Sequence, residues 1–137
     1  MKLRFRLLAL SAVVLLAACH SAMATYPELK DRDSRVVIDF LDHYKHHDID
    51  GMMTELNDDA EFRGSGSTLN KPQIKRFFQQ ALKKHPDLRI EFGPPQRVCG
   101  TVQVQVQRED STITRATWIF VLKNNKIHSY SIRPGEP

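Results

Sequence analysis

The segment HHDIDGMMTELNDDAEF, residues 46–62, decides the fold that we expect for this chain. Its middle predicts a short helix over residues 50–56, whose apolar side chains, two methionines and a leucine, turn inward. Its end predicts a strand over residues 58–62, because side chains alternate between the two faces of a strand. Ala60 and Phe62 then face the core, and the acidic residues beside them face solvent.

Two longer amphipathic helices flank this segment. The upstream helix is expected to begin between residues 27 and 34, where capping side chains are frequent, and to end near His47. Asn70 caps the downstream helix and Pro86 ends it. Each helix has one apolar face, formed by Val36, Val37, Phe40, Leu41 and Tyr44 in the first and by Ile74, Phe77, Phe78, Ala81 and Leu82 in the second.

The chain after Pro86 alternates between apolar and polar side chains, which is typical of half-buried strands. Valines alternate with glutamines over residues 102–107, and Asn124-Asn125 marks a tight hairpin turn. Helices followed by a run of strands predict an α+β fold, a curved antiparallel sheet with about three helices packed on its concave face. RGSGS, residues 63–67, is predicted to be a loop.

The order of elements around Asp48-Ile49-Asp50-Gly51 resembles the nuclear transport factor 2-like superfamily, which includes the ketosteroid isomerases and the SnoaL-like polyketide cyclases. An aromatic-bearing helix precedes this motif, and a short apolar helix and Asp-Asp-Ala before a strand follow it. The resemblance covers residues 28–133. It implies a cone-shaped fold, with helices closing one end of a bent sheet around an apolar pocket, and dimerisation through the outer sheet face.

The resemblance also implies that isomerase chemistry is absent. Ketosteroid isomerases use a tyrosine on the first helix, an aspartate base after the first strand and a protonated aspartate on a late strand. In this sequence those positions fall on Phe40, Gly64 and, close by, Trp118. We therefore predict no catalytic residue and no cofactor. The alternative is an isomerase-type or cyclase-type enzyme with a relocated base, for which His128 is the best candidate.

Side chains that face the inside of the cone are the candidates for ligand binding. Apolar walls with few polar groups suit a small apolar ligand. The same side chains would equally fill a closed core, so both interpretations stay open. The candidate ligand-binding residues are Phe40, Tyr44, Trp118, Phe120, His128 and Tyr130.

The remaining chemistry-bearing residues predict structural roles. His43 and His47 have a spacing at which two imidazoles can share a metal, but the sequence offers no assured third ligand. Histidines are also favoured near the C-terminal end of a helix by its dipole, so we expect no metal site. Cys99, which precedes Gly100 at the start of a strand, is expected to be a small core residue.

The start of the chain predicts an export signal. Three basic residues precede an apolar run over residues 7–18, which is too short to span a bilayer. LAAC, residues 16–19, resembles the lipobox of bacterial lipoproteins and implies cleavage before Cys19, with lipidation of its thiol. The alternative is cleavage after AMA, before Thr25, which would release a soluble periplasmic or secreted protein.

We therefore divide the chain into a lipoprotein signal peptide (1–18), a tether (19–27), one domain (28–133) and a tail (134–137). The full chain has 20 Lys and Arg against 16 Asp and Glu. Three of the basic residues lie in the signal peptide, which leaves 17 against 16, or a net charge of +1. Such a weak charge argues against a nucleic-acid partner. Lipidation of Cys19 would also leave a single unmodified thiol and no intrachain disulfide.

Three functions are compatible with these patterns. The first is a non-catalytic domain, lipid-anchored in the bacterial envelope and facing the periplasm, that binds a small apolar ligand or a protein partner at the membrane surface. Its polar outer sheet face is a candidate homodimer surface. The second is the enzyme with a relocated base. The third, by analogy of fold alone, is a periplasmic subunit of an envelope assembly.

Overall fold

The computed structural model describes residues 31–64 and 66–135. The predicted signal peptide, with Cys19 and Thr25, lies outside these residues. The elements within them are α1 (Arg32–Lys45), α2 (Ile49–Thr54), β1 (Leu56–Gly64), β2 (Ser67–Asn70), α3 (Lys71–Lys84), β3 (Arg89–Phe92), β4 (Gln96–Val98), β5 (Thr101–Glu109), β6 (Ile113–Lys123) and β7 (Lys126–Pro134).

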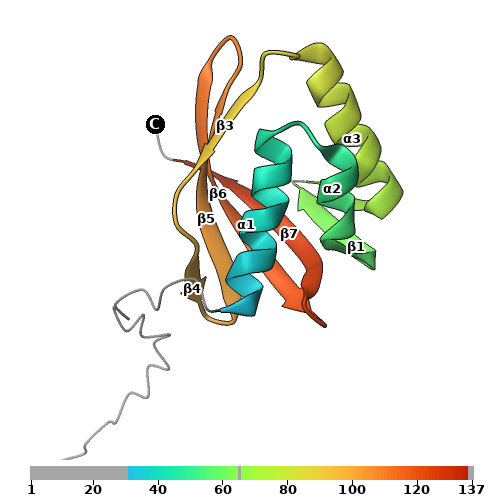
Figure 1. The fold of residues 1–137 in the computed structure, drawn as a ribbon, viewed down its shortest axis with the longest axis vertical. Helices are drawn as coiled ribbons and strands as arrows, with labels where there is room; N and C mark the ends of the chain where they lie inside the picture. Colours follow the sequence, from blue (N-terminus) through green and yellow to red (C-terminus); the bar gives the residue numbers. More distant parts are fainter. Residues whose placement is uncertain (1–30, 65, 136–137) are drawn as a thin grey trace, which may run out of the picture.

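The strands form one curved sheet with the order β2-β1-β7-β6-β5-β3, and β4 pairs with β5. Figure 1 shows α1 lying across one face of this sheet, with α2 and α3 beside it. The α+β class and the helix-covered concave face are as predicted. The fully antiparallel pairing is wrong, because β1 runs parallel to β7. Hairpin turns make β5, β6 and β7 antiparallel, but a long connection separates β1 from β7 and leaves their relative direction free.

Side chains cap the start of each helix. Asp31 accepts the backbone N–H of Asp33 at the start of α1, within the range predicted for it. Asn70 and Gln73 form a reciprocal capping box at the start of α3. α2 ends at Thr54, earlier than predicted, because the chain turns there into β1.

The motif around Gly51 has a steric basis. Asp48 caps α2 by accepting the backbone N–H of Gly51 at 2.9 Å, and its other carboxylate oxygen lies 2.9 Å from Nδ1 of His43. A Cβ atom at Gly51 would lie 2.3 Å from both the Asp48 carboxylate and the His43 ring. Glycine therefore lets the α1–α2 corner close around this pair.

The short strands β2 and β4 were not predicted, because each is joined to a neighbouring strand by a tight turn. The segment predicted as a loop contains the turn between β1 and β2, where Gly64 pairs with Ser67 and Gly66 has a φ of 87°. Cys99 and Gly100, with φ values of 48° and 77°, turn β4 back onto β5. Cys99 is exposed and disulfide-bonded, which corrects the expectation of a small core residue with an unmodified thiol.

The core lies between the concave sheet face and the helices. Ala60 of β1 and the valines of residues 102–106 in β5 are buried as expected, whereas Phe62 is partly buried. Phe77 departs from its predicted place in the buried stripe of α3, because it is 43% exposed. The largest fully buried side chains are Trp118, Tyr44, Phe40, Phe78, Phe120, Leu41 and Met52.

Candidate ligand-binding pocket

Five of the six predicted ligand-binding residues meet inside the fold. Phe40 touches Phe120 and Tyr130 with ring centroids 5.8 Å apart in each case, and Trp118 stacks on Tyr130 at 5.7 Å with an interplanar angle of 10°. Tyr44 packs edge-on against Phe78 of α3. These rings are almost completely buried, so the space beneath the helices is filled by side chains.

His128, the sixth predicted residue, lies elsewhere. It has no partner in the β6–β7 ladder, because Val121 pairs with Ser129 and Leu122 with Ile127, and so it forms a bulge. Its Nδ1 is buried without a hydrogen bond and lies 3.8 Å from a carboxylate oxygen of Asp59. Asp59 is highly exposed on the outward side of β1, as predicted. The structure therefore does not bring His128 into the aromatic cluster.

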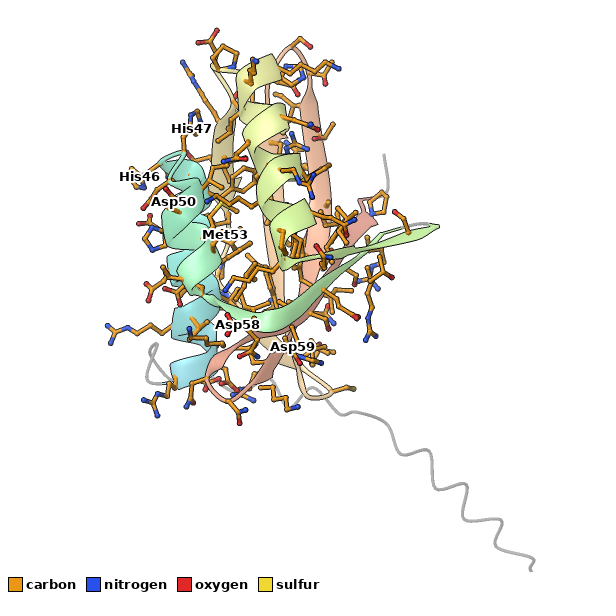
Figure 2. All side chains as sticks on the ribbon, turned by 90° about the vertical axis from the view of Figure 1, so that its right-hand side faces the viewer. His46, His47, Asp50, Met53, Asp58 and Asp59 are labelled. Carbon is orange, nitrogen blue, oxygen red and sulfur yellow. The ribbon has the colours of Figure 1, made fainter. Side chains whose placement is uncertain are left out.

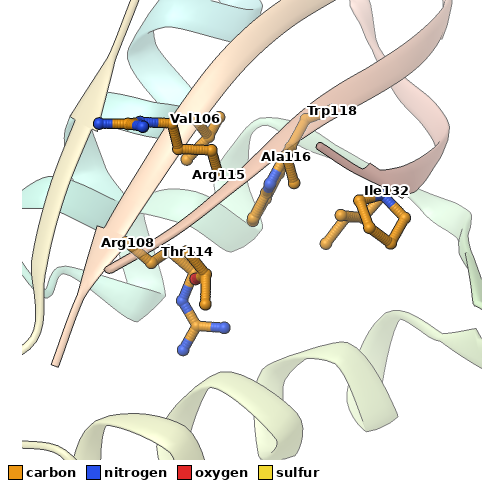
Figure 3. A pocket seen from close by; sticks show the side chains of 8 residues that line it. Val106, Arg108, Thr114, Arg115, Ala116, Trp118 and Ile132 are labelled. Carbon is orange, nitrogen blue, oxygen red and sulfur yellow. The ribbon is translucent and has the colours of Figure 1, made fainter. Parts of the chain in front are cut away.

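A cavity of about 210 Å³ lies at the other end of the concave face, near the turn between β5 and β6 (Figure 3). Cross-strand register builds it: Val106 pairs with Ala116, and Trp118 pairs with Ile132. The small side chain of Ala116 leaves space that the large rings fill further along β6. The lining residues are Val106, Arg108, Thr114, Arg115, Ala116, Trp118, Ile132 and Pro134.

Two charged residues, Arg108 and Arg115, line this cavity, and Arg108 lies on its inward side. It continues the inward-facing row of β5, in which alternate residues from Val102 to Val106 are buried, and it pairs with Thr114. Its Nε atom is buried and has no hydrogen-bond partner among the described residues. Figure 3 shows the Arg108 guanidinium projecting into the space between the sheet and α3, whereas Arg115 points the other way.

The two buried tyrosines stay protonated. Burial raises the pKa of the Tyr44 hydroxyl, and the positive charge of Arg108 opposes that rise. Burial raises the pKa of Tyr130 more strongly, and Tyr44 adds to the effect. Neither hydroxyl is therefore suited to act as a base at neutral pH.

The positions that correspond to isomerase catalytic groups lie in ordinary structural sites. Phe40 is buried on α1, and Trp118 is buried on β6. Gly64 ends β1, where an added Cβ atom would lie 3.1 Å from the ring of Phe62. None of the residues that line the cavity is an aspartate, glutamate or histidine. The polar groups of the lining are the side chains of Arg108 and Arg115, the Thr114 hydroxyl and the Trp118 indole, and none of the lining residues has the carboxylate or imidazole of a usual general base.

The two histidines with metal-like spacing hold different partners. Nδ1 of His43 lies 2.9 Å from a carboxylate oxygen of Asp48. His47 lies just after the end of α1 (Figure 2), and its Nε2 is 2.7 Å from the backbone oxygen of Leu88. Within residues 31–64 and 66–135 no cluster of His, Cys, Asp or Glu could hold a metal ion. In the same part of the chain no helix is long and apolar enough to cross a membrane.

Comparisons with known proteins define the fold. No family model and no curated protein matches the sequence. Among solved structures, a putative polyketide cyclase from Sinorhizobium meliloti matches with a TM-score of 0.65 and 17% identity, over 72% of this chain and 94% of that one. A putative ketosteroid isomerase from Kribbella flavida matches with a TM-score of 0.67 and 10% identity, over 77% and 79%. An NTF2-like protein of unknown function from Burkholderia pseudomallei matches with a TM-score of 0.66 and 12% identity, over 77% and 92%.

These likenesses confirm the predicted fold, a nuclear transport factor 2-like cone of α+β class. At such low identities they extend to the fold alone. Arg108 was not predicted as a site residue, although the sequence contained a signal for it: the period-two row of β5 valines continues onto a charged residue instead of an apolar one. A charged side chain at an inward-facing position of a strand is unusual, because charged residues are rarely buried without a partner.

Proposed function

We propose that this protein is a non-catalytic binding domain, tethered to the bacterial envelope, that takes a small apolar ligand in the cavity beside Trp118. The observation that carries the proposal is the contrast between a filled aromatic core and a preserved cavity of about 210 Å³ on the same sheet face. Ligand cavities are mostly apolar with a few placed polar groups, and typical volumes begin at about 300 Å³. The ligand is therefore small.

The absence of an acid or base among the lining residues favours binding over catalysis. His128, the best candidate for a relocated base, is not among them and lies by Asp59. An enzyme of the isomerase or cyclase kind requires a base within hydrogen-bond reach of the substrate. We expect His128→Ala to leave ligand binding unchanged, and turnover of an enolisable substrate that this variant abolishes would contradict the proposal.

The cavity can be tested by melting and fluorescence. A ligand at 100 times its dissociation constant adds about 2.7 kcal/mol to the free energy of unfolding, which raises the Tm of a domain of this size by on the order of 10 °C. Trp118 is the single tryptophan, so its emission reports directly on the cavity. A panel of small apolar compounds, octanol among them, should contain members that change both signals.

Ala116→Leu tests whether the ligand binds in this cavity. The added side chain would fill the cavity, so binding should disappear while the fold remains. Val121→Leu is the matched control, because Val121 lies on the same strand, is exposed and does not line the cavity. Binding that survives Ala116→Leu, or a panel without any binder, would overturn the proposed pocket.

The proposed location, a lipid anchor in the bacterial envelope, rests on LAAC at residues 16–19 and on the short apolar run before it. The sequence has two cysteines, so an intrachain disulfide of Cys99 would use Cys19 and would exclude a lipid thioether on the same sulfur. The disulfide of Cys99 is compatible with the anchor only where its partner sulfur belongs to another chain. A mass spectrum of the mature protein from a bacterial membrane distinguishes the outcomes. An acylated N-terminal Cys19 supports the anchor, and an unacylated chain that begins at Thr25 contradicts it.

The outer sheet face is the candidate surface for a homodimer. Gln105 donates a hydrogen bond to Thr117 across β5 and β6 at 2.8 Å, and the neighbouring outward positions of β5, Gln103 and Gln107, are also polar. Sedimentation of the domain at several concentrations tests this part of the proposal. Gln105→Arg, at an exposed outward position of β5, should shift a dimer to a monomer, whereas a monomer at all concentrations would remove dimerisation from the proposal.

A further inference from the structure

We propose that Arg108 makes the cavity selective for small amphiphilic monocarboxylates, with the carboxylate on the Arg108 guanidinium and the apolar part against Trp118 and Ile132. This inference rests on the proposed function, because it requires that the cavity binds a ligand. It goes further by naming the chemical class of that ligand and the residue that selects it.

The Arg108 side chain has an unsatisfied donor. Buried polar atoms are almost always hydrogen-bonded, and a buried donor without a partner destabilises the folded protein. Nε of Arg108 is such an atom. An acceptor that enters the cavity would recover this cost, so the site gains most from a ligand with an oxygen at one end.

The positive charge of Arg108 is not paired with an acidic side chain among the described residues. None of the ion pairs found among the described residues includes Arg108. The nearby Asp110 is engaged in its own turn, where its carboxylate accepts the backbone N–H of Thr112 at 2.9 Å. That hydrogen bond also lowers the pKa of Asp110. The guanidinium in the cavity therefore lacks a charge partner among the residues that the structure describes.

The orientation of the two arginines that line the cavity sets the charge of the ligand. Arg115 also contributes to the lining, but its Nε donates to Gln107 at 3.1 Å and its side chain points away from Arg108. One cation in the cavity is neutralised by one negative charge, whereas a dianion would leave an uncompensated charge out of water. A planar carboxylate also matches the guanidinium fork, which can donate two parallel hydrogen bonds.

The apolar lining residues favour a ligand with an apolar part. They are Val106, Ala116, Trp118, Ile132 and Pro134, and the lining is completed by Thr114 and by Arg115, whose side chain points away from Arg108. A free inorganic anion has no apolar surface to bury against these residues. A short aliphatic or aryl chain buries against them, and each buried methylene strengthens binding.

The test compares octanoate with octanol, two probes of similar length that differ in charge at neutral pH. Their dissociation constants are measured by calorimetry on the intact folded protein, with inorganic phosphate as a further probe. We expect octanoate to bind at least tenfold more tightly than octanol, and phosphate not to bind. Equal binding of octanoate and octanol would overturn the selectivity while leaving the apolar pocket of the proposed function in place.

Arg108→Gln is the decisive variant, because glutamine keeps a polar chain and removes the charge. Octanoate affinity should fall at least tenfold, and octanol affinity should change by less than about twofold, since charge-assisted hydrogen bonds contribute roughly 1.5–3 kcal/mol. Arg133→Gln is the matched control: it removes the same charge from the exposed face of β7, opposite Thr117, and should leave both affinities unchanged.

Each failure has a separate meaning. Loss of octanoate affinity in Arg133→Gln as well would show a general charge effect and would overturn the role of Arg108. Binding of neither probe to the unmodified protein would overturn the proposed pocket itself. Far-ultraviolet circular dichroism and the Tm of each variant confirm that it is folded before its affinity is interpreted.

Discussion

The concave face of this sheet has two parts that differ in how they are filled. Beneath α1 and α3, aromatic rings pack against one another with centroid distances of 4.9–6.5 Å and leave no room. Toward the β5–β6 turn, the same face carries Thr114, Ala116 and Arg108, and a cavity remains. We call the first part the covered half and the second part the open half.

A change of side-chain size along β6 marks the boundary between the two halves. Trp118 and Phe120 are large and buried, whereas two positions earlier on the same face Ala116 is small and partly exposed. Trp118 belongs to both halves, because it stacks in the core and also lines the cavity. One strand therefore provides both the stability of the cone and the space for a ligand, and substitutions should affect the halves in opposite ways.

The largest effect is expected in the covered half. Phe40→Ala would remove a fully buried ring that contacts Phe78, Phe120 and Tyr130. We expect it to lower the free energy of unfolding by about 3–5 kcal/mol, measured by urea denaturation. Val121→Ala, an exposed apolar site on β6, should cost less than about 1 kcal/mol. Similar losses for the two variants would contradict a tightly packed covered half.

In the open half, by contrast, we expect a substitution that removes a side-chain group to raise the free energy of unfolding. Arg108→Met removes a buried donor without a partner and keeps an apolar stem, so we expect the ligand-free protein to gain about 1–2 kcal/mol of unfolding free energy. Arg133→Met, at an exposed position, should change stability by less than about 0.5 kcal/mol. A loss of stability in Arg108→Met would show that the guanidinium is satisfied in the folded chain and would remove the contrast.

Local patterns predicted the covered half well. Helical spacing identified the buried residues of α1, and alternation identified the buried valines of β5, because each follows from the geometry of a single element. The three helices and the hairpin at Asn124-Asn125 were also readable, since caps and turns depend on a few neighbouring residues. The order of these elements was enough to predict the cone.

The open half was not predictable in the same way, because it depends on contacts between distant strands. The cavity exists where Ala116 meets Val106 across the sheet, and no local pattern fixes that register. His128 was misplaced for a similar reason: the bulge at Val121 and Leu122 shifts the alternation of β7, so counting by two from Tyr130 gives the wrong face. The parallel pairing of β1 with β7 likewise joins segments far apart in the chain.

A substitution at the border of the covered half should have an intermediate effect on the free energy of unfolding. Phe77 was predicted to be buried with the rest of the α3 stripe, yet it is partly exposed and stacks on Phe62 at 6.3 Å. Phe77→Ala should therefore cost about 1 kcal/mol, well below Phe40→Ala, because only part of the ring is removed from contact. Urea denaturation checks this, with Gln80→Ala on the exposed side of α3 as the control. A cost as large as that of Phe40→Ala would place Phe77 inside the core.

The smallest effect is expected where the covered half ends in solvent, at the start of α1. Arg97 of β4 donates from Nη2 to Asp31 at 2.8 Å and to Asp33 at 2.7 Å, and its Nε also contacts Asp31. The hydrogen bonds from Arg97 lower the pKa of Asp31 below its ordinary value of 3.8. Because these groups are partly exposed, Arg97→Gln should cost only about 0.5 kcal/mol at neutral pH.

The pH dependence of the free energy of unfolding distinguishes a contribution of the Arg97–Asp31 ion pair from a contribution of side-chain packing. A carboxylate whose pKa is lowered by folding contributes stability above its unfolded pKa, and that contribution is lost as the pH falls through the lowered pKa. The difference between the unmodified protein and Arg97→Gln should therefore be constant above about pH 5 and shrink below pH 4. Urea denaturation at several pH values measures it, with Arg133→Gln as the control. A difference that persists at the lowest pH at which the protein folds would mean that the Arg97 side chain acts through packing, so that the covered half extends to its solvent edge.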